Sequence, residues 1–263
     1  MRSIRWLTVI ILILSVCFNG ISFAMENEEN YFENESKFLS ALGFKGFEKF
    51  DTTNAETVLT RAEFADIVVR LMGYHAFELP NKSIFLDVPE EHPSSGSISF
   101  LAISGVVSAS DTDMFRPDDV ILFEEAVKMI VSAIGYRPYA DLKGGYPSGY
   151  IAAAQYAGIF DGVDIQANSF TKGVACKLIY NALFAPVMTT MAYNHRTDLH
   201  IDKDKTVLNQ FFKIEELKGR VNATRYTALT GGINLGEGQI KIEQLVLITE
   251  EDVSKYLGYY VIA

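Results

Sequence analysis

The chain repeats itself, and this internal repetition constrains its fold more strongly than any single motif does. LTRAEFADIVVRLMGY (59–74) aligns without a gap with ILFEEAVKMIVSAIGY (121–136), and the apolar positions of the two segments coincide. The same offset places Gly43 of FLSALGF on Gly105 of FLAISGV. The repetition therefore covers a whole structural unit and not one helix alone.

A third copy follows further along the chain. IAAAQYAGIF (151–160) aligns with ISFLAISGVV (98–107), and TKGVACKLIYNALF (171–184) takes the place of the second helix. Each unit has a first helix that ends near a glycine, a variable loop, and a second helix with a periodic apolar stripe. One unit cannot bury its own stripe, whereas three units can bury their stripes against one another. We therefore predict a mainly α domain with pseudo-threefold organisation over about residues 30–190.

The chain changes character after Pro186. MTTMAYNHRTDLHIDKDKT is polar and without periodicity, which predicts a solvated linker over residues 189–212. QIKIEQLVLI alternates apolar and polar residues between glycines, which predicts a small β-rich C-terminal domain over residues 213–263. The last residues, YYVIA, read as a strand. This strand is either a final edge strand or the sign that the sequence is a fragment of a longer protein.

The N-terminus has the features of a secretory signal peptide over residues 1–24. Arg2 and Arg5 precede an apolar run, Trp6–Phe18, that is shorter than the roughly 20 residues of a membrane-spanning helix. Small residues lead to Ala24, after which we expect cleavage. The pattern predicts an exported protein without membrane insertion after signal cleavage.

Charge and cysteine content restrict the partners and the chemistry. Removal of residues 1–24 takes away two arginines and no acid, which changes the formal net charge from −10 to −12 and disfavours nucleic acid as a partner. Lipid attachment at Cys17 is disfavoured because Val16 precedes it. Cys176 would then be the single cysteine of the mature chain, so no intrachain disulfide can form.

Catalytic and metal-binding patterns do not assemble in this sequence. His195, His200 and the aspartates between and after them have spacings that fit no usual ligand set, so a solvated segment is the simpler interpretation. The chain has no GxSxG, no paired Cys and His, and no phosphate-binding glycine loop. We therefore predict no enzyme, no cofactor and no metal site.

Several segments together resemble S-layer homology (SLH) motifs: FLDVPEEH, FRPDDVILFEEAVKMIVSAIGY, KGGYPSGY and TRAEFADIVVRLMGY. The resemblance gives three repeats, at residues 36–78, 79–140 and 141–188, after an acidic segment at 25–35. The variants EEAVKMIVSAIGY, KGGYPSGYIAAA and LIYNAL are similar to those of clostridial-type exported proteins. The resemblance implies a three-pronged helical spindle whose grooves hold secondary cell-wall polymers of Gram-positive bacteria, often pyruvylated amino-sugar chains.

The TRAE segment that begins the second helix of the first repeat combines a helix cap with one unexplained charge. Thr60 and Glu63 have the spacing of a capping box. Arg61 is a cation at the positive end of a helix dipole, which costs about 0.3–1 kcal/mol unless an anion lies nearby. The anion is either an acid of a neighbouring repeat, such as Asp87 or Glu90, or a carboxylate of a wall glycan. The resemblance favours the glycan.

The other two repeats differ from the first at the position of Arg61. The third repeat keeps a cation, Lys172, whereas the second has Phe123, which we expect to pack against apolar neighbours. Arg61 and Lys172 are therefore the expected charge anchors of two grooves. Arg116 is a weaker candidate, since it can pair locally with Asp118 or Asp119, one of which we expect to cap the following helix.

Three further residues complete the glycan-binding candidates. Asp87 and His92 lie in FLDVPEEH, where the family commonly has a tryptophan after the histidine; here Pro93 follows. Tyr146, with Tyr150 behind it, can supply a stacking face for a sugar. The alternatives are that Asp87 is a turn or cap acid, His92 a solvated loop residue, and the tyrosines loop anchors.

The resemblance implies non-catalytic anchoring of an exported protein to cell-wall polysaccharide, at the cell wall or S-layer surface of a Gram-positive-type bacterium. The alternative is a structural role: a degenerate triplet that binds no glycan and either forms a surface lattice by self-association or supports the β-rich domain. An exported enzyme with its catalytic module beyond residue 263 is a third possibility.

Overall fold

The computed structural model describes residues 32–262, apart from 49, 51, 76–78, 81, 83, 109–112, 164–169, 194–195, 230, 232–234 and 250–253. The predicted signal peptide, most of the acidic segment and His195 lie outside the described residues. Within the described part, no helix is both long and apolar enough to cross a membrane. The chain divides into two compact units, one up to Phe212 and one from Lys213 onward.

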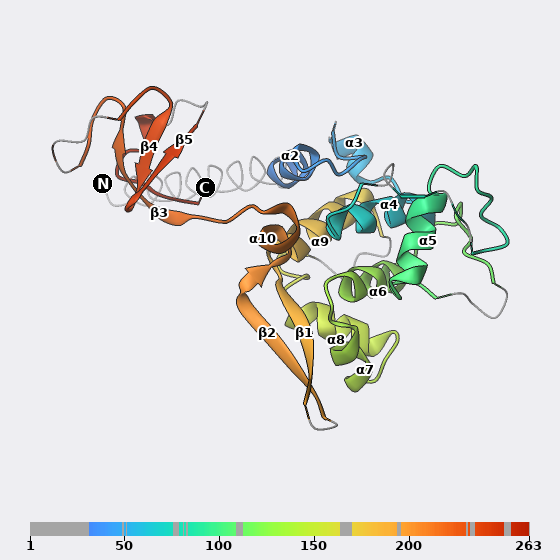
Figure 1. Cartoon of the computed structure of the whole chain (residues 1–263). Coiled ribbons are helices and arrows are strands. Elements are labelled where there is room, and N and C mark those ends of the chain that lie inside the picture. The colour runs from blue at the N-terminus through green and yellow to red at the C-terminus, as the bar shows by residue number, and fades with distance from the viewer. Residues whose placement is uncertain are drawn as a thin grey trace, which may run out of the picture. The chain divides into compact units, whose positions relative to one another are not determined.

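The first unit is mostly helical (Figure 1). Its principal helices form three successive pairs of a shorter and a longer helix: α2 (Glu33–Ala41) with α4 (Arg61–Leu71), α5 (Ser95–Ile103) with α6 (Phe123–Ala133), and α8 (Ser148–Tyr156) with α9 (Lys172–Phe184). Two short helices, α3 (Thr52–Ala55) and α7 (Arg137–Leu142), lie in the connections. The helical character predicted for this part of the chain is confirmed.

The aligned glycines end the first helix of each pair in the same way. Gly43, Gly105 and Gly158 have φ angles of +80°, +73° and +76°, a region that residues with a Cβ rarely adopt. In each case the next N–H reaches back to a helix carbonyl, as from Phe44 to Leu39 at 3.0 Å, and the glycine N–H closes the inner bond. This is the Schellman motif. The three repeated glycines thus have one structural cause.

The second helices begin with related but unequal caps. The Thr60 hydroxyl accepts from the Glu63 N–H, and the Glu63 carboxylate accepts from the Thr60 N–H, so the predicted capping box forms. Thr171 caps α9 through the Val174 N–H. The expectation that Asp118 or Asp119 caps α6 is wrong, because the cap position is Leu122. A leucine has no side-chain acceptor, so only the second bond of the box forms, in which the Leu122 N–H donates to the Glu125 carboxylate.

The apolar stripes of α4, α6 and α9 contribute to one hydrophobic cluster. Val68, Ile130 and Ile179 are fully buried in it. Short β-bridges also join the segments that lead into these helices, Val58 with Thr171 and Thr60 with Val120. The three helix pairs therefore share a core, whereas the three repeats and their spindle arrangement stay predictions.

The segment expected to be a linker is folded. β1 (Pro186–Tyr193) and β2 (Arg196–Thr206) form an antiparallel hairpin, which extends beyond the helices (Figure 1), and α10 (Val207–Phe212) follows. The linker prediction was wrong because a few apolar residues hold the segment at its two ends. Val187 and Met188 are buried at the start of the hairpin, and Val207 and Leu208 are buried at its end.

The second unit is a four-stranded antiparallel sheet in the order β5-β4-β3-β6. Its strands are β3 (Lys218–Thr224), β4 (Gln239–Ile242), β5 (Leu245–Ile248) and β6 (Tyr260–Ile262), with a 3-10 turn, η2 (Ser254–Tyr256), before β6. Val221, Ile240 and Ile242 form its small buried core. The β-rich character of this part is confirmed.

Candidate functional site

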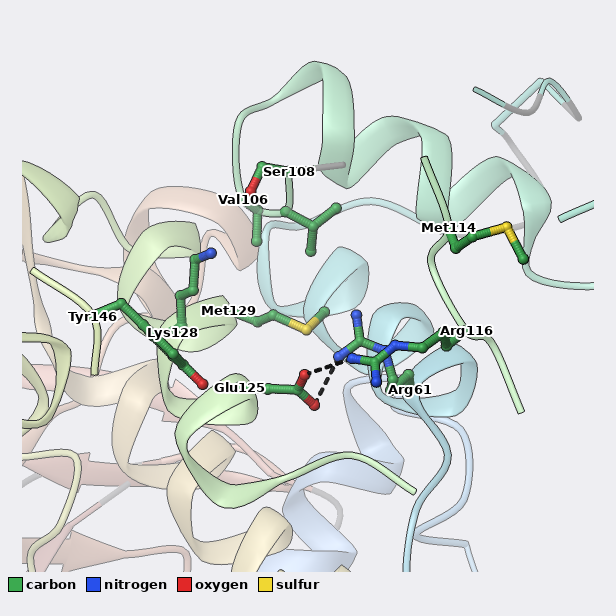
Figure 2. A pocket seen from close by; sticks show the side chains of 10 residues that line it. Arg61, Val106, Ser108, Met114, Arg116, Glu125, Lys128, Met129 and Tyr146 are labelled. Atoms are coloured by element: carbon green, nitrogen blue, oxygen red, sulfur yellow. Dashed lines mark hydrogen bonds and ion pairs between the residues drawn. The ribbon is translucent and has the colours of Figure 1, made fainter. Parts of the chain in front are cut away.

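A pocket of about 480 Å³ opens on the first unit (Figure 2). It is lined by three cations, one acid, one tyrosine and a mostly apolar remainder: Arg61, Arg116, Lys128, Glu125, Tyr146, Val106, Val107, Ser108, Met114 and Met129. Residues from all three predicted repeats contribute. Three of the six predicted site residues, Arg61, Arg116 and Tyr146, are brought together here.

Arg61 joins the first predicted repeat to the second predicted repeat. Its backbone N–H donates to the Asp119 carbonyl at 2.9 Å. Its Nε donates to the Phe115 carbonyl at 2.8 Å, and its guanidinium lies 4.8 Å from the centroid of the Phe115 ring. One terminal nitrogen forms an ion pair with Glu125 at 2.7 Å. An acid of a neighbouring repeat therefore does face this cation, but it is Glu125 and not Asp87 or Glu90, because Glu125 projects into the pocket from the first turn of α6.

Glu125 is shared between two arginines (Figure 2). One carboxylate oxygen pairs with Arg61, and the other accepts from Arg116 at 3.2 Å. Arg116 is more exposed than Arg61 and also lies 3.6 Å from Asp119. The local pairing expected for Arg116 therefore forms, with Glu125 as the nearer partner.

Asp87 lies outside the pocket lining and fixes the loop that carries Arg116. Its two carboxylate oxygens accept from the backbone N–H groups of Phe115 at 2.8 Å and Arg116 at 2.6 Å. Arg116 has a φ of +61°, a conformation that most residues avoid. The two bonds from Asp87 stabilise this strained turn, so Asp87 positions a pocket residue without lining the pocket.

His92 and Lys172 also lie outside the pocket lining. His92 Nδ1 accepts from the Ser94 N–H at 3.1 Å, just before α5 begins. The Lys172 N–H donates to the Thr57 carbonyl at 2.7 Å, and its side chain passes beside Gly46. The structure thus does not bring these two candidates to Arg61.

Lys128 is the pocket cation that the sequence interpretation missed. It lies on α6, three residues after Glu125 and therefore on the same face of the helix. Its Nζ lies 5.5 Å from the centroid of the Tyr146 ring. Burial lowers the pKa of Lys128, and the positive charges of Arg137 and Arg61 lower it further. The i, i+3 spacing from Glu125 is the signal that could have identified it.

Tyr146 forms one side of the pocket and is about half exposed. Burial raises the pKa of its hydroxyl, and the charges of Glu124 and Glu125 add to this effect. The hydroxyl therefore stays a neutral donor and acceptor at physiological pH. Three cations against one acid, next to a tyrosine and apolar side chains, suit a small anionic group attached to a partly apolar body.

Comparison with known proteins supports a surface protein. Residues 84–127, which include Val106, Arg116 and Glu125 of the pocket, match the S-layer homology domain family. The chain is 29% identical over 185 residues to a middle cell wall protein of Brevibacillus brevis. This alignment covers 69% of this chain and 17% of that protein. It is 26% identical over 225 residues to a surface layer protein of Brevibacillus choshinensis, an alignment that covers 82% of this chain and 20% of that protein. It is 28% identical over 134 residues to a cell surface protein of Thermoanaerobacter kivui, with 49% of this chain and 17% of that protein covered.

The chain thus contains a segment of the S-layer homology class and is similar to bacterial cell-wall and surface proteins. It spans a fifth or less of the length of these relatives. The matched segment lies within the second predicted repeat. The triplet, its clostridial type and the signal peptide stay predictions.

Proposed function

We propose that this chain anchors an exported protein to the cell wall without catalysis, by binding an anionic secondary cell-wall polymer in the pocket of Arg61, Arg116 and Lys128. The observation that carries the proposal is the charge of the pocket. The chain as a whole has a formal net charge of −10, yet the pocket lining has three cations and one acid. Such a local reversal of sign favours an anionic ligand.

The lining of the pocket favours a carboxylated sugar, such as a pyruvylated amino sugar. A carboxylate can approach the cations, while the ring of Tyr146 and the side chains of Val106 and Met129 offer apolar contact to a sugar face. A polymer provides many copies of the same group, so moderate affinity at one pocket suffices for retention at the wall.

A sedimentation experiment tests the proposal. The purified protein is mixed with cell walls that retain the secondary polymer, with walls stripped of it, and with walls whose polymer has lost its pyruvate groups by mild acid treatment. We expect pelleting with intact walls only. Equal pelleting with all three preparations, or none with any, refutes the proposal.

A pair of charge variants locates the binding site. Arg116→Gln removes an exposed pocket cation and should reduce pelleting. Arg225→Gln makes the same change at an exposed arginine of the second unit, which pairs with Glu237 at 3.2 Å, and should leave pelleting unchanged. Equal loss in both variants would point to non-specific charge attraction.

A structural role is the second candidate. It is favoured by the observation that Arg61 and Arg116 are already paired with Glu125, and by the absence of any tryptophan other than Trp6 from the sequence. A degenerate triplet of this kind would self-associate into a surface lattice. Concentration-dependent light scattering without affinity for walls would select it.

A further inference from the structure

The second helices of the three predicted repeats carry a polar residue at one equivalent position. Asp66 on α4, Lys128 on α6 and Lys177 on α9 each lie five residues after Arg61 or its counterpart. Each faces the beginning of a first helix from another repeat. The partners found there differ, and this difference separates the pocket from the two equivalent places.

Two of the three positions are already paired. Asp66 accepts from the Ser94 hydroxyl at 2.9 Å, directly before α5. Lys177 forms an ion pair with Glu35 of α2 at 2.8 Å, and both side chains are largely buried. These contacts hold one repeat against another and leave no cation at either place for a ligand.

Lys128 differs from both. It meets the ring of Tyr146 ahead of α8. None of the residues that the structure describes forms a hydrogen bond or an ion pair with its ammonium group. Lys128 is half-buried, and it lines the cavity beside Tyr146 (Figure 2). Glu125 and Asp141 act on Lys128 only through longer-range charge attraction. A partly desolvated cation without a hydrogen-bonded or ion-paired anion is an unfavourable arrangement that a bound anion would relieve.

The two arginines of the pocket, in contrast to Lys128, already have anionic partners. Arg61 is held by the Phe115 carbonyl and by Glu125, and Arg116 is held by Glu125 and Asp119. For a ligand to pair with Arg61, the ion pair between Arg61 and Glu125 at 2.7 Å would have to break. Glu125, whose side chain is only 20% exposed, would then lose its nearest cation. Arg61 therefore contributes little to direct contact with an anion.

We propose that Lys128, and not Arg61, pairs directly with the anionic group of the ligand, and that Arg61 is a positioning residue that holds Glu125 and the Phe115 loop. This inference rests on the proposed function of the same pocket. Because one unpaired cation remains next to a carboxylate, the pocket selects a group with a single negative charge, such as a sugar carboxylate, over a dianionic phosphate monoester.

Calorimetric titration of the purified chain with solubilised wall polymer tests the assignment. Lys128→Gln removes the charge and keeps the length of the side chain, and we expect affinity to fall roughly ten- to a hundredfold. Lys128→Arg restores the charge and should bind within a few-fold of the unchanged protein. Lys143→Gln makes the same charge change at an exposed lysine outside the pocket lining and should have no effect.

The outcomes separate the inference from the proposed function. If the unchanged protein binds and Arg116→Gln weakens binding while Lys128→Gln does not, the assignment of Lys128 is overturned and the pocket stands. If the unchanged protein does not bind the polymer, the proposed function is refuted, and the inference about Lys128 is refuted as well. Thermal unfolding of each variant is the folding control, because restoration by arginine but not by glutamine at equal stability is not expected from a merely structural lysine.

Discussion

Replacement of Glu125 by glutamine should change stability and ligand affinity in opposite directions. The neutral side chain leaves Arg61 and Arg116 without their shared counter-ion. Removal of one partner from a buried ion pair costs about 3–5 kcal/mol, whereas an exposed pair is worth about 0–1 kcal/mol. Arg61 and Glu125 are 13% and 20% exposed, nearer the buried limit. Since glutamine can still hydrogen-bond, we expect a loss of about 2–3 kcal/mol in the free energy of unfolding.

The same substitution removes the single acid from the pocket lining. Its repulsion of an approaching carboxylate disappears, and Arg61 becomes available to the ligand. At the effective dielectric of a protein surface, one charge at about 10 Å contributes on the order of 1 kcal/mol, so polymer affinity should rise roughly fivefold. Stability is measured by urea unfolding and affinity by calorimetric titration.

Glu63→Gln is the matched control. Glu63 and Glu125 both accept a hydrogen bond from a backbone N–H at the start of their helices, and the amide oxygen of glutamine can accept this bond equally well. Glu63 is exposed and has no arginine partner among the residues described. The control should therefore differ from the unchanged protein by less than about 0.5 kcal/mol. Equal stability of the two variants, or weaker polymer binding by Glu125→Gln, would refute the reasoning.

Three further expectations follow from the geometry. Polymer affinity should be present in full while Lys128 is protonated, and it should fall as pH rises through the lowered pKa of Lys128, at a lower pH than for an ordinary lysine. A titration of binding against pH checks this. The midpoint is set by the charged groups that face Lys128: Arg61, Arg116, Arg137, Glu125 and Asp141. Lys172→Gln should leave wall pelleting unchanged if the pocket of Lys128 is the binding site, and a clear loss would restore the groove expected at Lys172. Tyr136→Phe should lower the free energy of unfolding by about 1–2 kcal/mol in urea, because the fully buried hydroxyl donates to the Pro186 carbonyl at 2.9 Å; an unchanged midpoint would contradict this.

The helices of the first unit could be predicted because their ends and apolar faces depend on short-range rules. A glycine at the end of a helix and an apolar residue every three or four positions leave the same trace in each copy. Gly43, Gly105 and Gly158 therefore predict the ends of three helices from the sequence alone. The capping box of Thr60 and Glu63 is equally local, since all its atoms lie within one turn.

The partner of Arg61 could not be predicted, because it depends on how one repeat meets the next. Glu125 lies more than sixty positions further along the chain, and its own sequence signal is that of a cap residue. Lys128 was missed for a related reason: the motif that resembles the family points to the start of the helix, whereas the unpaired cation lies one turn further in. Lys128 has no ion-pair partner among the residues that the structure describes, and this is a property of the packing that no local sequence pattern records.

The hairpin could not be predicted from polarity, because a polar segment can still form paired strands. MTTMAYNHRTDLHIDKDKT is polar, yet two strands can pair through their backbones alone when their ends are fixed. Val187 and Val207 supply those fixed ends. Such anchoring by a few residues has no periodic signature.

The closed base of the hairpin determines where a pulling force would act on the first unit. The Val207 N–H donates to the Ala185 carbonyl at 3.2 Å, so the chain leaves and re-enters the helical body at one place. A force applied beyond Lys213 would reach Phe212 first, whose ring stacks on Phe44 at 5.9 Å and lies 4.6 Å beneath the guanidinium of Arg70. If the protein were held at a surface, tension would thus act first on α10 and its contacts. The hairpin would not be stretched until α10 detaches from the helical body.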